Sequence, residues 1–309
     1  MSRIDLLADI GGTNARVAFR EDGAPWREVY LRETADYPSL DALLADVMSK
    51  AGVKPTRAIV ALPGPVAGES IKLTNLPWRV ARRSLAQELG IPALTVINDL
   101  EAVAWSLPHL ASNDVVTWRM GHPAHAARVV VAPGTGLGVS ALVPYGEAWT
   151  AVPSEGGHAL AVMPRTTPEP MRRLWHTMPS WEDLLSGGGL LRLYQAFGDA
   201  PAAVAPAEVT ARAQWGEARA LEAIGFFSEL LGACAGDMAI IFAAKGGCAI
   251  AGGVVPALGS LFDVARFIAG FTGKGPYGDY VDTIPLALIS HPHPALVGLA
   301  ALLDSTSRG

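Results

Sequence analysis

The sequence predicts an α/β protein built from two lobes, and three observations lead to this prediction. The chain has 309 residues, whereas a single hydrophobic core seldom serves more than about 250–300 residues. Short apolar runs alternate with segments of helical periodicity in both halves of the chain. A strand, a glycine turn and a second strand follow one another twice, at residues 8–19 and 131–142.

In the first 109 residues, strands and helices are expected to alternate. The expected strands are residues 4–8, 17–19, 58–62 and 94–97, and the expected helices are residues 40–51, 80–89 and 100–105. Gly52 and Gly90 directly follow the first two helices, as is typical of helix ends. The last of these strands leads into Asn98 and Asp99, so a carboxylate is expected at its carboxyl end.

Residues 110–127 have a loop-like pattern and are expected to lead into the second lobe. Beyond them, the expected strands are residues 128–132, 138–143, 249–251 and 286–289, and the expected helices are residues 181–197, 217–244 and 294–303. The final helix is expected to pack back on the first lobe.

Composition and charge narrow the classes of function. Half of the residues are hydrophobic and 17% are charged, as in a folded globular protein. The formal net charge of -5 gives no electrostatic reason to bind nucleic acid or an anionic membrane. The N-terminus lacks signal-peptide features and no apolar run approaches the roughly 20 residues that span a bilayer, so we expect a cytoplasmic protein. Cys234 and Cys248 form no zinc-binding pattern and are expected to be reduced and buried.

Two glycine turns carry the first chemical signal. Both combine glycines with a threonine hydroxyl, and their residues are Gly11, Gly12 and Thr13 in the first and Gly134, Thr135 and Gly136 in the second. Glycines let main-chain N–H groups approach phosphate oxygens, and Asp9, just before the first turn, is suited to orient a hydrated magnesium ion. Either turn alone is also typical of a hairpin without a ligand. The pair indicates a nucleotide whose phosphates are held between two related halves.

Two other nucleotide-binding patterns are excluded. The second turn resembles a dinucleotide fingerprint, but a strand rather than a helix is expected after it. No glycine-rich stretch ends in Gly-Lys-Ser or Gly-Lys-Thr, so the chain has no Walker A sequence.

The pair Asn98 and Asp99 carries the next signal. A carboxylate at a rigid strand end is suited to act as the base for a sugar hydroxyl, because catalysis needs it within hydrogen-bond reach of that proton. The alternative is that Asp99 caps the helix that begins at Leu100.

A third group consists of Glu155, His158 and Glu182, with two glycines between the first two. Carboxylates and an imidazole can bind several hydroxyls, and the glycines leave room for a sugar ring. Glu155 and His158 also fit a metal site, although zinc needs three or four ligands and no compact third partner is visible. For Glu182 the alternative is a first-turn acid favoured by the helix dipole. Gly252 and Gly253, after a strand, either accommodate an adenosine or form a close packing turn.

Taken in order, these pieces resemble the bacterial glucokinases of the actin/hexokinase superfamily, in the group without a zinc motif. The matching stretches run nearly end to end and are ADIGGTNAR (8–16), LTNLPW (73–78), INDLEA (97–102), GTGLG (134–138), EGGH (155–158), LSGGGL (185–190) and AGGVVP (251–256). Ser154 and Ala159 depart from the family pattern, which more often has a glycine and an aliphatic residue there. Residues 164–179 do not align with the family pattern.

The resemblance implies a two-lobed actin-like ATPase (ribonuclease H-like) fold with the active site in the interlobe cleft. The small α/β lobe would comprise residues 1–109 and 294–309, and the large α/β lobe residues 110–293. It further implies ATP and Mg²⁺ as cofactors, glucose as substrate and a homodimer. Asp99 would be the catalytic base, and the sugar hydroxyls would be bound by Asn98, Glu155, His158 and Glu182. The nucleotide would be bound by Asp9, Gly11, Gly12, Thr13, Gly134, Thr135, Gly136, Gly252 and Gly253.

The expected reaction is direct in-line transfer of the γ-phosphoryl group of ATP to the 6-hydroxyl of glucose. Two alternatives remain open at this point. One is a kinase for another hexose or amino sugar, because the hydroxyl-binding groups do not declare which sugar fits. The other is a non-catalytic sugar sensor on the same fold, which would not need the base Asp99. ADP or polyphosphate as phosphoryl donor is also left open.

Overall fold

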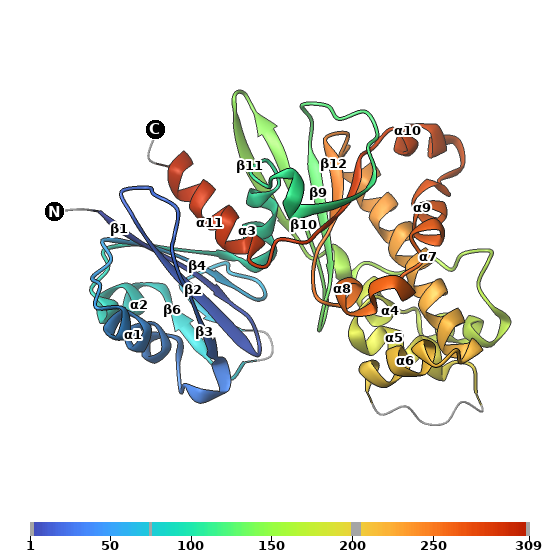
Figure 1. Ribbon diagram of the computed structural model, residues 1–309, viewed down its shortest axis with the longest axis horizontal. Coiled ribbons are helices and arrows are strands. Elements are labelled where there is room, and N and C mark those ends of the chain that lie inside the picture. The colour runs from blue at the N-terminus through green and yellow to red at the C-terminus, as the bar shows by residue number, and fades with distance from the viewer. Residues whose placement is uncertain (1–2, 74–75, 199–204, 307–309) are drawn as a thin grey trace. The chain divides into compact units, whose positions relative to one another are not determined.

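The computed structural model describes residues 3–73, 76–198 and 205–306. The chain divides into two compact units, and each is described by itself below (Figure 1). Unit 1 comprises Met1–Leu110 and Pro292–Gly309, and unit 2 comprises Ala111–His291. Thr74 and Asn75, which belong to the matching stretch 73–78, lie outside the described residues.

Unit 1 contains a five-stranded mixed sheet with the strand order β3-β2-β1-β4-β7. Its strands are β1 (Ile4–Ile10), β2 (Asn14–Glu21), β3 (Val29–Glu33), β4 (Arg57–Leu62) and β7 (Ala93–Asn98). The first three form an antiparallel meander, and β4 and β7 extend the sheet parallel to β1. A separate hairpin pairs β5 (Ser70–Lys72) with β6 (Arg79–Ala81).

Helices cover both faces of this sheet, as Figure 1 shows. They are α1 (Leu40–Ala51), α2 (Arg82–Leu89), α3 (Asp99–Ser106) and α11 (Pro294–Ser305). Successive side chains of a strand point to opposite faces. Leu6 and Ala8 of β1 therefore pack in the core that contains α1 and α2, whereas Leu7 packs in the core that contains α3 and α11. The final helix thus packs on strands of unit 1, as expected from the sequence.

Local signals account for the ends of the helices in unit 1. Ser39 caps α1 by accepting a hydrogen bond from the N–H of Ala42, and Gly52 ends the helix in the left-handed conformation with φ 66°. Gly90 ends α2 in the same way. The prediction was wrong at the start of α2, because Val80 and Ala81 pair in the β5–β6 hairpin instead of continuing the helix.

A buried charge cluster joins α11 to the sheet. The guanidinium of Arg20, 3% exposed, lies 3.1 Å from Asp5 and 2.7 Å from Asp304 of α11. Arg57 lies 2.8 Å from the second oxygen of Asp5. Burial alone would raise the pKa of Asp5, but its hydrogen bond to Arg57 and the charges of Arg57, Arg20 and Arg3 together lower it.

Unit 2 contains a six-stranded sheet with the order β11-β10-β9-β12-β13-β8. Its strands are β8 (Val115–Arg119), β9 (Arg128–Pro133), β10 (Leu137–Tyr145), β11 (Ala148–Ser154), β12 (Gly247–Ile250) and β13 (Leu286–Ile289). The strands β9, β10 and β11 are antiparallel, and β12 and β13 are parallel to β9. This order repeats that of unit 1, so the internal repeat detected in two hairpins extends to five strands.

The strand β8 was missed in the sequence, where residues 110–127 were expected to be irregular. It is an edge strand that pairs with β13, and it brings Val115 opposite Ile289. Edge strands are half-solvated, and the short sequence of β8 has no strict alternation of apolar and polar residues. The pairing partner lies far away in the chain, so no local pattern marks the strand.

The helices of unit 2 are α4 (Trp181–Leu184), α5 (Gly187–Gln195), α6 (Pro206–Gln214), α7 (Ala218–Ile241), α8 (Val254–Leu258), α9 (Val264–Thr272) and α10 (Gly278–Asp282). The helix expected at residues 181–197 is two helices. Ser186 separates them, because its hydroxyl accepts the N–H of Gly189 at 3.0 Å and starts α5.

The helix α7 forms the centre of the unit 2 core. Its length and composition would allow it to span a membrane, but 72% of its most apolar window is buried inside the protein, as in a core helix. The bent pair 254–261 and 264–272 passes the same test only if it is joined across a bend of 116°. Cys234 of α7 and Cys248 of β12 are free and buried, as expected, and burial raises the pKa of both thiols.

Candidate active site

The first glycine turn connects β1 to β2 in unit 1. The N–H of Gly11 donates to the carbonyl oxygen of Asn14 at 2.9 Å and closes the turn. Gly12, Thr13 and Asn14 are exposed at its tip. The turn therefore presents main-chain groups to solvent at the carboxyl end of β1, as phosphate binding requires.

Asp9 lies just before this turn, and its side chain is 17% exposed. Burial raises the pKa of Asp9, while the charge of Arg16 acts in the opposite direction. Arg16 Nη1 lies 3.5 Å from Asp9 Oδ2. Sequence reasoning assigned no role to Arg16. Its pairing with Asp9 follows from the register of β1 and β2, which places the two residues opposite each other.

Asn98, rather than Asp99, caps helix α3. The side-chain oxygen of Asn98 accepts hydrogen bonds from the N–H groups of Leu100 at 2.9 Å and Glu101 at 3.2 Å. Its Nδ2 donates to the carbonyl oxygen of Gly64 at 3.1 Å. Asp99 is the first residue of α3 rather than its cap, and its Oδ1 also accepts the N–H of Leu100 at 2.9 Å. Asn98 and Asp99 therefore both bind main-chain N–H groups in the first turn of α3.

The first glycine turn with Asp9 and the pair Asn98 and Asp99 both belong to unit 1. They lie at the same end of its sheet, where the parallel strands have their carboxyl ends. The strands β1, β4 and β7 are parallel, and their registers pair Asp9 with Ala61 and Leu62 with Asn98. Neighbouring strands lie about 4.8 Å apart, so Asp9 and Asn98 sit on strands separated by roughly 10 Å. The carboxyl ends of parallel strands in open α/β sheets are where ligands usually bind.

The second glycine turn connects β9 to β10 in unit 2. The N–H of Gly134 donates to the carbonyl oxygen of Gly136 at 2.8 Å, and the N–H of Gly187 donates to that of Gly134 at 2.9 Å. The second bond attaches the turn to the start of α5. Thr135 is exposed at the tip.

Glu182 is bonded directly to this turn. Its Oε2 accepts the main-chain N–H of Leu137 at 2.8 Å. A Cβ at Gly136 would collide with Glu182 Oε2, so a side chain there would displace this carboxylate. Glu182 lies in the first turn of α4, as the helix-dipole alternative expects, but this contact gives it a second role.

Three of the four residues expected to bind sugar hydroxyls, Glu155, His158 and Glu182, lie together in unit 2. His158 Nδ1 is 3.9 Å from Glu182 Oε1, and His158 Nε2 is 3.9 Å from Glu155 Oε2. The side chains of Glu155 and His158 are each 61% exposed, and that of Glu182 is 35% exposed. The imidazole thus stands between two carboxylates that remain accessible to a ligand.

The glycines between Glu155 and His158 are explained by packing. A side chain at Gly157 would collide with the carbonyl oxygen of Leu137, which places the short 3-10 helix η3 (Gly156–His158) directly against the second glycine turn. The N–H of Gly156 donates to Ser154 Oγ at 2.9 Å. Ser154, which departs from the family pattern, therefore supports the start of this segment.

Gly252 and Gly253 lie at the carboxyl end of β12, beside the second turn. The strand β12 is parallel to β9, and Ala251 donates to the carbonyl oxygen of Val131 at 3.0 Å. Gly252 has φ 77°, and a side chain there would collide with the carbonyl oxygen of Pro133. Close packing thus explains Gly252, whereas Gly253 is exposed and has open space around it.

Known proteins resemble this chain along nearly its whole length. A family model described as glucokinase matches residues 6–306. The glucokinase of Nitrobacter hamburgensis is 38% identical over 317 residues, covering 98% of this chain and 98% of the relative. The glucokinase of Chromobacterium violaceum is 36% identical over 311 residues, covering 96% of this chain and 88% of the relative.

The chain belongs to the glucokinase family. Solved structures share its fold. A glucokinase from an Antarctic psychrotroph has a TM-score of 0.86 at 31% identity, with 98% of this chain and 99% of that chain covered. A ROK family glucokinase from Streptomyces griseus, solved with glucose and AMPPNP, has a TM-score of 0.64 at 17% identity, with 98% of this chain and 99% of that chain covered. The α/β class and the relation to the actin-like ATPase superfamily are thereby confirmed.

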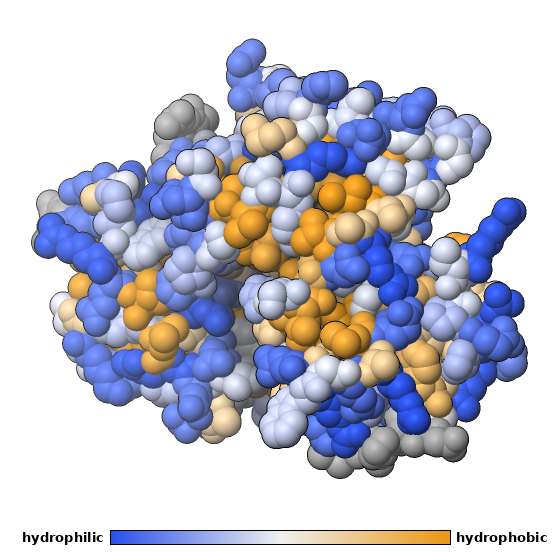
Figure 2. All heavy atoms as spheres, turned by 45° about the vertical axis from the view of Figure 1, so that its right-hand side comes forward, coloured by the Kyte–Doolittle hydropathy of each residue, from blue (hydrophilic) through white to orange (hydrophobic). Residues whose placement is uncertain are grey.

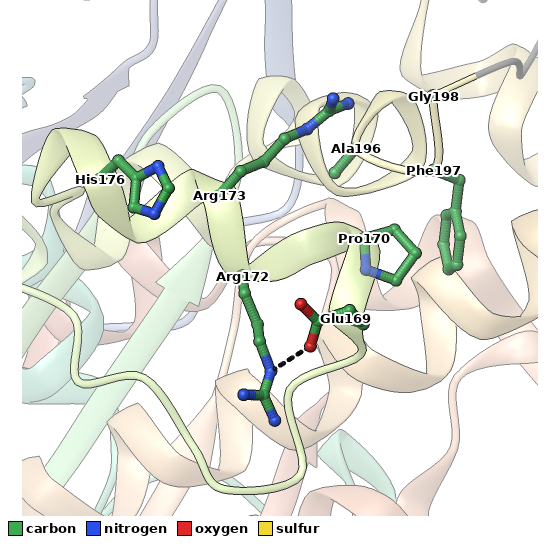
Figure 3. A pocket seen from close by; sticks show the side chains of 8 residues that line it. All are labelled: Glu169, Pro170, Arg172, Arg173, His176, Ala196, Phe197 and Gly198. Atoms are coloured by element: carbon green, nitrogen blue, oxygen red, sulfur yellow. Dashed lines mark ion pairs between the residues drawn. The ribbon is translucent and has the colours of Figure 1, made fainter.

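A cavity of about 360 Å³ in unit 2 contains none of the predicted site residues of this glucokinase family member. It is lined by Arg172, Arg173, His176 and Phe197, among others (Figure 3). Arg172 pairs with Glu169 at 3.1 Å, and Arg173 donates to the carbonyl oxygen of Gln195 at 3.2 Å.

The metal alternative for Glu155 and His158 gains no support. Within residues 3–73, 76–198 and 205–306, no group of three or more His, Cys, Asp or Glu side chains could hold a metal ion. Magnesium has other requirements, since it keeps several waters and binds one or two carboxylates together with phosphate oxygens. The partly exposed carboxylate of Asp9, beside a turn suited to phosphate, fits those requirements.

Proposed function

We propose that this member of the glucokinase family transfers the γ-phosphoryl group of ATP to the 6-hydroxyl of D-glucose. The observation that carries the proposal is the direct bond between Glu182 and the turn at Gly136 and Leu137. Through it, a cluster suited to sugar hydroxyls adjoins a turn suited to phosphates. Both ligand types are needed at one site for phosphoryl transfer to a sugar.

Asp99 is proposed as the general base. It accepts the proton of the 6-hydroxyl as that oxygen attacks the γ-phosphorus, while the phosphorus–oxygen bond to ADP breaks. The end of β7 and the cap made by Asn98 hold the start of α3 in place, which limits the positions that this carboxylate can adopt. Asn98 retains one Nδ2 hydrogen beyond its bond to Gly64 that can reach a sugar hydroxyl.

Glu155, His158 and Glu182 are proposed to bind the other sugar hydroxyls. Two carboxylates on either side of one imidazole supply acceptors together with a donor, and this mixture suits a ring with several adjacent hydroxyls. Gly157 allows the segment to pack against the carbonyl oxygen of Leu137, so a sugar bound there would lie close to phosphates held by the second turn.

Nucleotide binding is proposed to use both turns. The N–H groups of the turns at Gly11–Thr13 and Gly134–Gly136 would bind phosphate oxygens, and Asp9 would orient the hydrated metal. Gly252 and Gly253 would lie beside the adenosine. They follow β12, which is parallel to β9, so they lie at the same end of the sheet as the second turn. Mg²⁺, when bound with ATP, neutralises charge that develops on the phosphoryl oxygens.

We further propose that the two units act as the lobes of one kinase, with the small lobe at residues 1–109 and 294–309 and the large lobe at residues 110–293. The chemistry supports this division. Asp99 belongs to unit 1 and the hydroxyl-binding cluster belongs to unit 2, so catalysis requires both to reach one sugar. A cleft between lobes that closes on the sugar would also exclude water as a competing acceptor.

A homodimer located in the cytoplasm completes the proposal. Hydrophobic side chains reach the surface in groups surrounded by hydrophilic ones (Figure 2). In unit 2, several exposed hydrophobic side chains belong to the segment 160–180, whose ends pair through an antiparallel bridge between Leu160 and Ser180. They are Leu160, Val162, Met163 and Met178. Light scattering after size-exclusion chromatography tests the dimer, and a monomer mass at micromolar concentration would contradict it.

The test of the activity is a coupled assay of ADP release with MgATP and a panel of sugars: glucose, mannose, fructose, glucosamine and N-acetylglucosamine. The expected result is turnover with glucose that is lost in Asp99→Asn. Preference for another sugar would keep the mechanism and change the substrate. Sugar binding without turnover would instead support a non-catalytic sensor.

A further inference from the structure

Thr34 lies beside the first glycine turn although it is 20 or more residues away in sequence from Gly12 and Thr13. It follows β3 and begins the short 3-10 helix η1 (Thr34–Asp36), and it is 1% exposed. The register of β2 and β3 pairs Asn14 with Glu33, which brings Thr34 level with Thr13.

Two hydrogen bonds connect Thr34 to successive carbonyl groups of the turn. Its hydroxyl donates to the carbonyl oxygen of Gly12 at 2.9 Å. Its main-chain N–H donates to the carbonyl oxygen of Thr13 at 2.9 Å. Both carbonyls are therefore oriented toward the buried Thr34.

The orientation of these carbonyls determines where the neighbouring N–H groups point. Peptide bonds among the described residues are trans, and in a trans peptide the C=O and the N–H point in opposite directions. The N–H of Thr13 shares a peptide with the Gly12 carbonyl, and the N–H of Asn14 shares one with the Thr13 carbonyl. Both N–H groups thus point away from Thr34, and the residues that carry them, Thr13 and Asn14, are exposed at the tip of the turn.

We propose that Thr34 is a positioning residue for the phosphoryl donor, because it presents the N–H groups of Thr13 and Asn14 to the phosphates of ATP. This inference rests on the proposed function of the turn. A glycine turn without such restraint would have to be ordered when the nucleotide binds, which weakens binding. Donors that are oriented beforehand need no reorganisation.

Thr56, an exposed residue that directly precedes β4, offers a control. Its N–H and its hydroxyl also donate to the main chain of β1, to the carbonyl oxygen of Ile4 at 2.8 Å and 3.2 Å. Ile4 is the first residue of β1, at the opposite end from the glycine turn. Thr56→Val therefore removes the same kind of bond without touching the turn.

The experiment compares Thr34→Val, Thr34→Ser and Thr56→Val in the full-length protein by calorimetric titration with AMPPNP and Mg²⁺. Thr34→Val keeps the shape and removes the hydroxyl, and we expect it to weaken AMPPNP binding about five- to tenfold, as for one lost hydrogen bond. Glucose affinity and kcat at saturating ATP should stay within about twofold of wild type, while KM for ATP rises. Thr34→Ser should restore AMPPNP binding, and Thr56→Val should not change it.

A Thr34→Val protein that binds AMPPNP as tightly as Thr56→Val does would overturn the proposal. A second measurement needs no variant: AMPPNP should slow hydrogen exchange at the Thr13 and Asn14 amides of the wild type, and unchanged exchange there would also overturn it. If the wild type binds AMPPNP with these effects but phosphorylates no sugar, the role of Thr34 stands and the proposed glucokinase function fails.

Discussion

Glu182 Oε2 accepts a hydrogen bond of 2.8 Å from the main-chain N–H of Leu137, the residue that follows the second glycine turn. The other oxygen of the same carboxylate lies 3.9 Å from His158 Nδ1. One side chain therefore connects the residues proposed to hold the sugar with the turn proposed to hold the phosphates. Ligands that bind on either side of such a link are expected to influence each other's affinity.

Two substitutions of Glu182 separate its two contacts. Glu182→Gln keeps an oxygen that accepts the Leu137 N–H but loses the charge, so KM for glucose should rise about tenfold or more while KM for ATP changes about twofold or less. Glu182→Ala loses both contacts, and both KM values should rise. Steady-state kinetics with each substrate varied in turn provide the measurement.

Glu155→Gln serves as the control for this pair of variants. Glu155 Oε2 lies 3.9 Å from His158 Nε2, and within the part of the chain that the structure describes its side chain does not bond to the second turn. The Glu155→Gln substitution should raise KM for glucose without changing KM for ATP. Equal effects of Glu182→Ala and Glu155→Gln on KM for ATP would refute the proposed link.

Asp99→Asn tests the base. We expect kcat to fall by about 10²- to 10⁴-fold, the range typical of general-base catalysis, with glucose affinity retained. Asp41→Asn is the matched control, because Asp41 also lies in the first turn of a helix, α1, and is distant in sequence from every proposed site residue. Thermal denaturation should show similar midpoints for both variants. A kcat near that of the wild type in Asp99→Asn would remove Asp99 from the mechanism.

Gly252 and Gly253 are adjacent, yet alanine should affect them differently. At Gly252 the positive φ and the collision with the Pro133 carbonyl oxygen predict a loss of about 1–3 kcal/mol in the free energy of unfolding. Gly253 has nothing within 4 Å of an added side chain, so Gly253→Ala should change stability by less than about 0.5 kcal/mol. Urea denaturation measures both. A rise in KM for ATP in the stable Gly253→Ala would then report contact with the nucleotide.

The buried carboxylate of Asp5 predicts a pH dependence of stability. Its pKa is lowered in the folded protein, since the hydrogen bond and charge of Arg57, with Arg20 and Arg3, outweigh the effect of burial. A lowered pKa means that the unfolded state binds more protons, so the stabilisation is fully present above the unfolded pKa of about 3.9 and is lost as pH falls below it. Asp5→Asn should cost about 3 kcal/mol at pH 7, and the difference from wild type should shrink at low pH.

Asp46→Asn is the control for this prediction. Asp46 is 29% exposed and binds Lys50 at 2.9 Å and the Tyr37 hydroxyl at 2.7 Å. These contacts lower its pKa in the same direction, but ion pairs at the surface contribute only about 1 kcal/mol or less, so the effect of Asp46→Asn should be smaller than that of Asp5→Asn. Chemical denaturation between pH 3 and pH 7 distinguishes the two. A constant difference between wild type and Asp5→Asn over that range would contradict the assigned cause.

Much of the fold could be predicted because the signals are local. The bounds of α1 follow from its periodicity, from Ser39 before it and from Gly52 after it. The hairpin β9–β10 follows from two apolar runs around a glycine turn. The strand β13 was also predicted at its observed bounds, Leu286–Ile289. In each case the residues that decide the structure are neighbours in the chain.

The sequence alone thus determined which residue types stand at strand ends and helix starts, and with them the candidate chemistry of Asp9, Asp99, Glu155, His158 and Glu182. Tertiary structure decided which of their atoms are already engaged: that Asn98 carries the cap of α3, that Glu182 binds Leu137 and that Thr34 orients the first turn. The physical reason is the directionality of hydrogen bonds. Whether two groups distant in sequence can bond depends on strand register and on the pairing of remote segments, such as β8 with β13, and these arise only when the whole sheet is assembled.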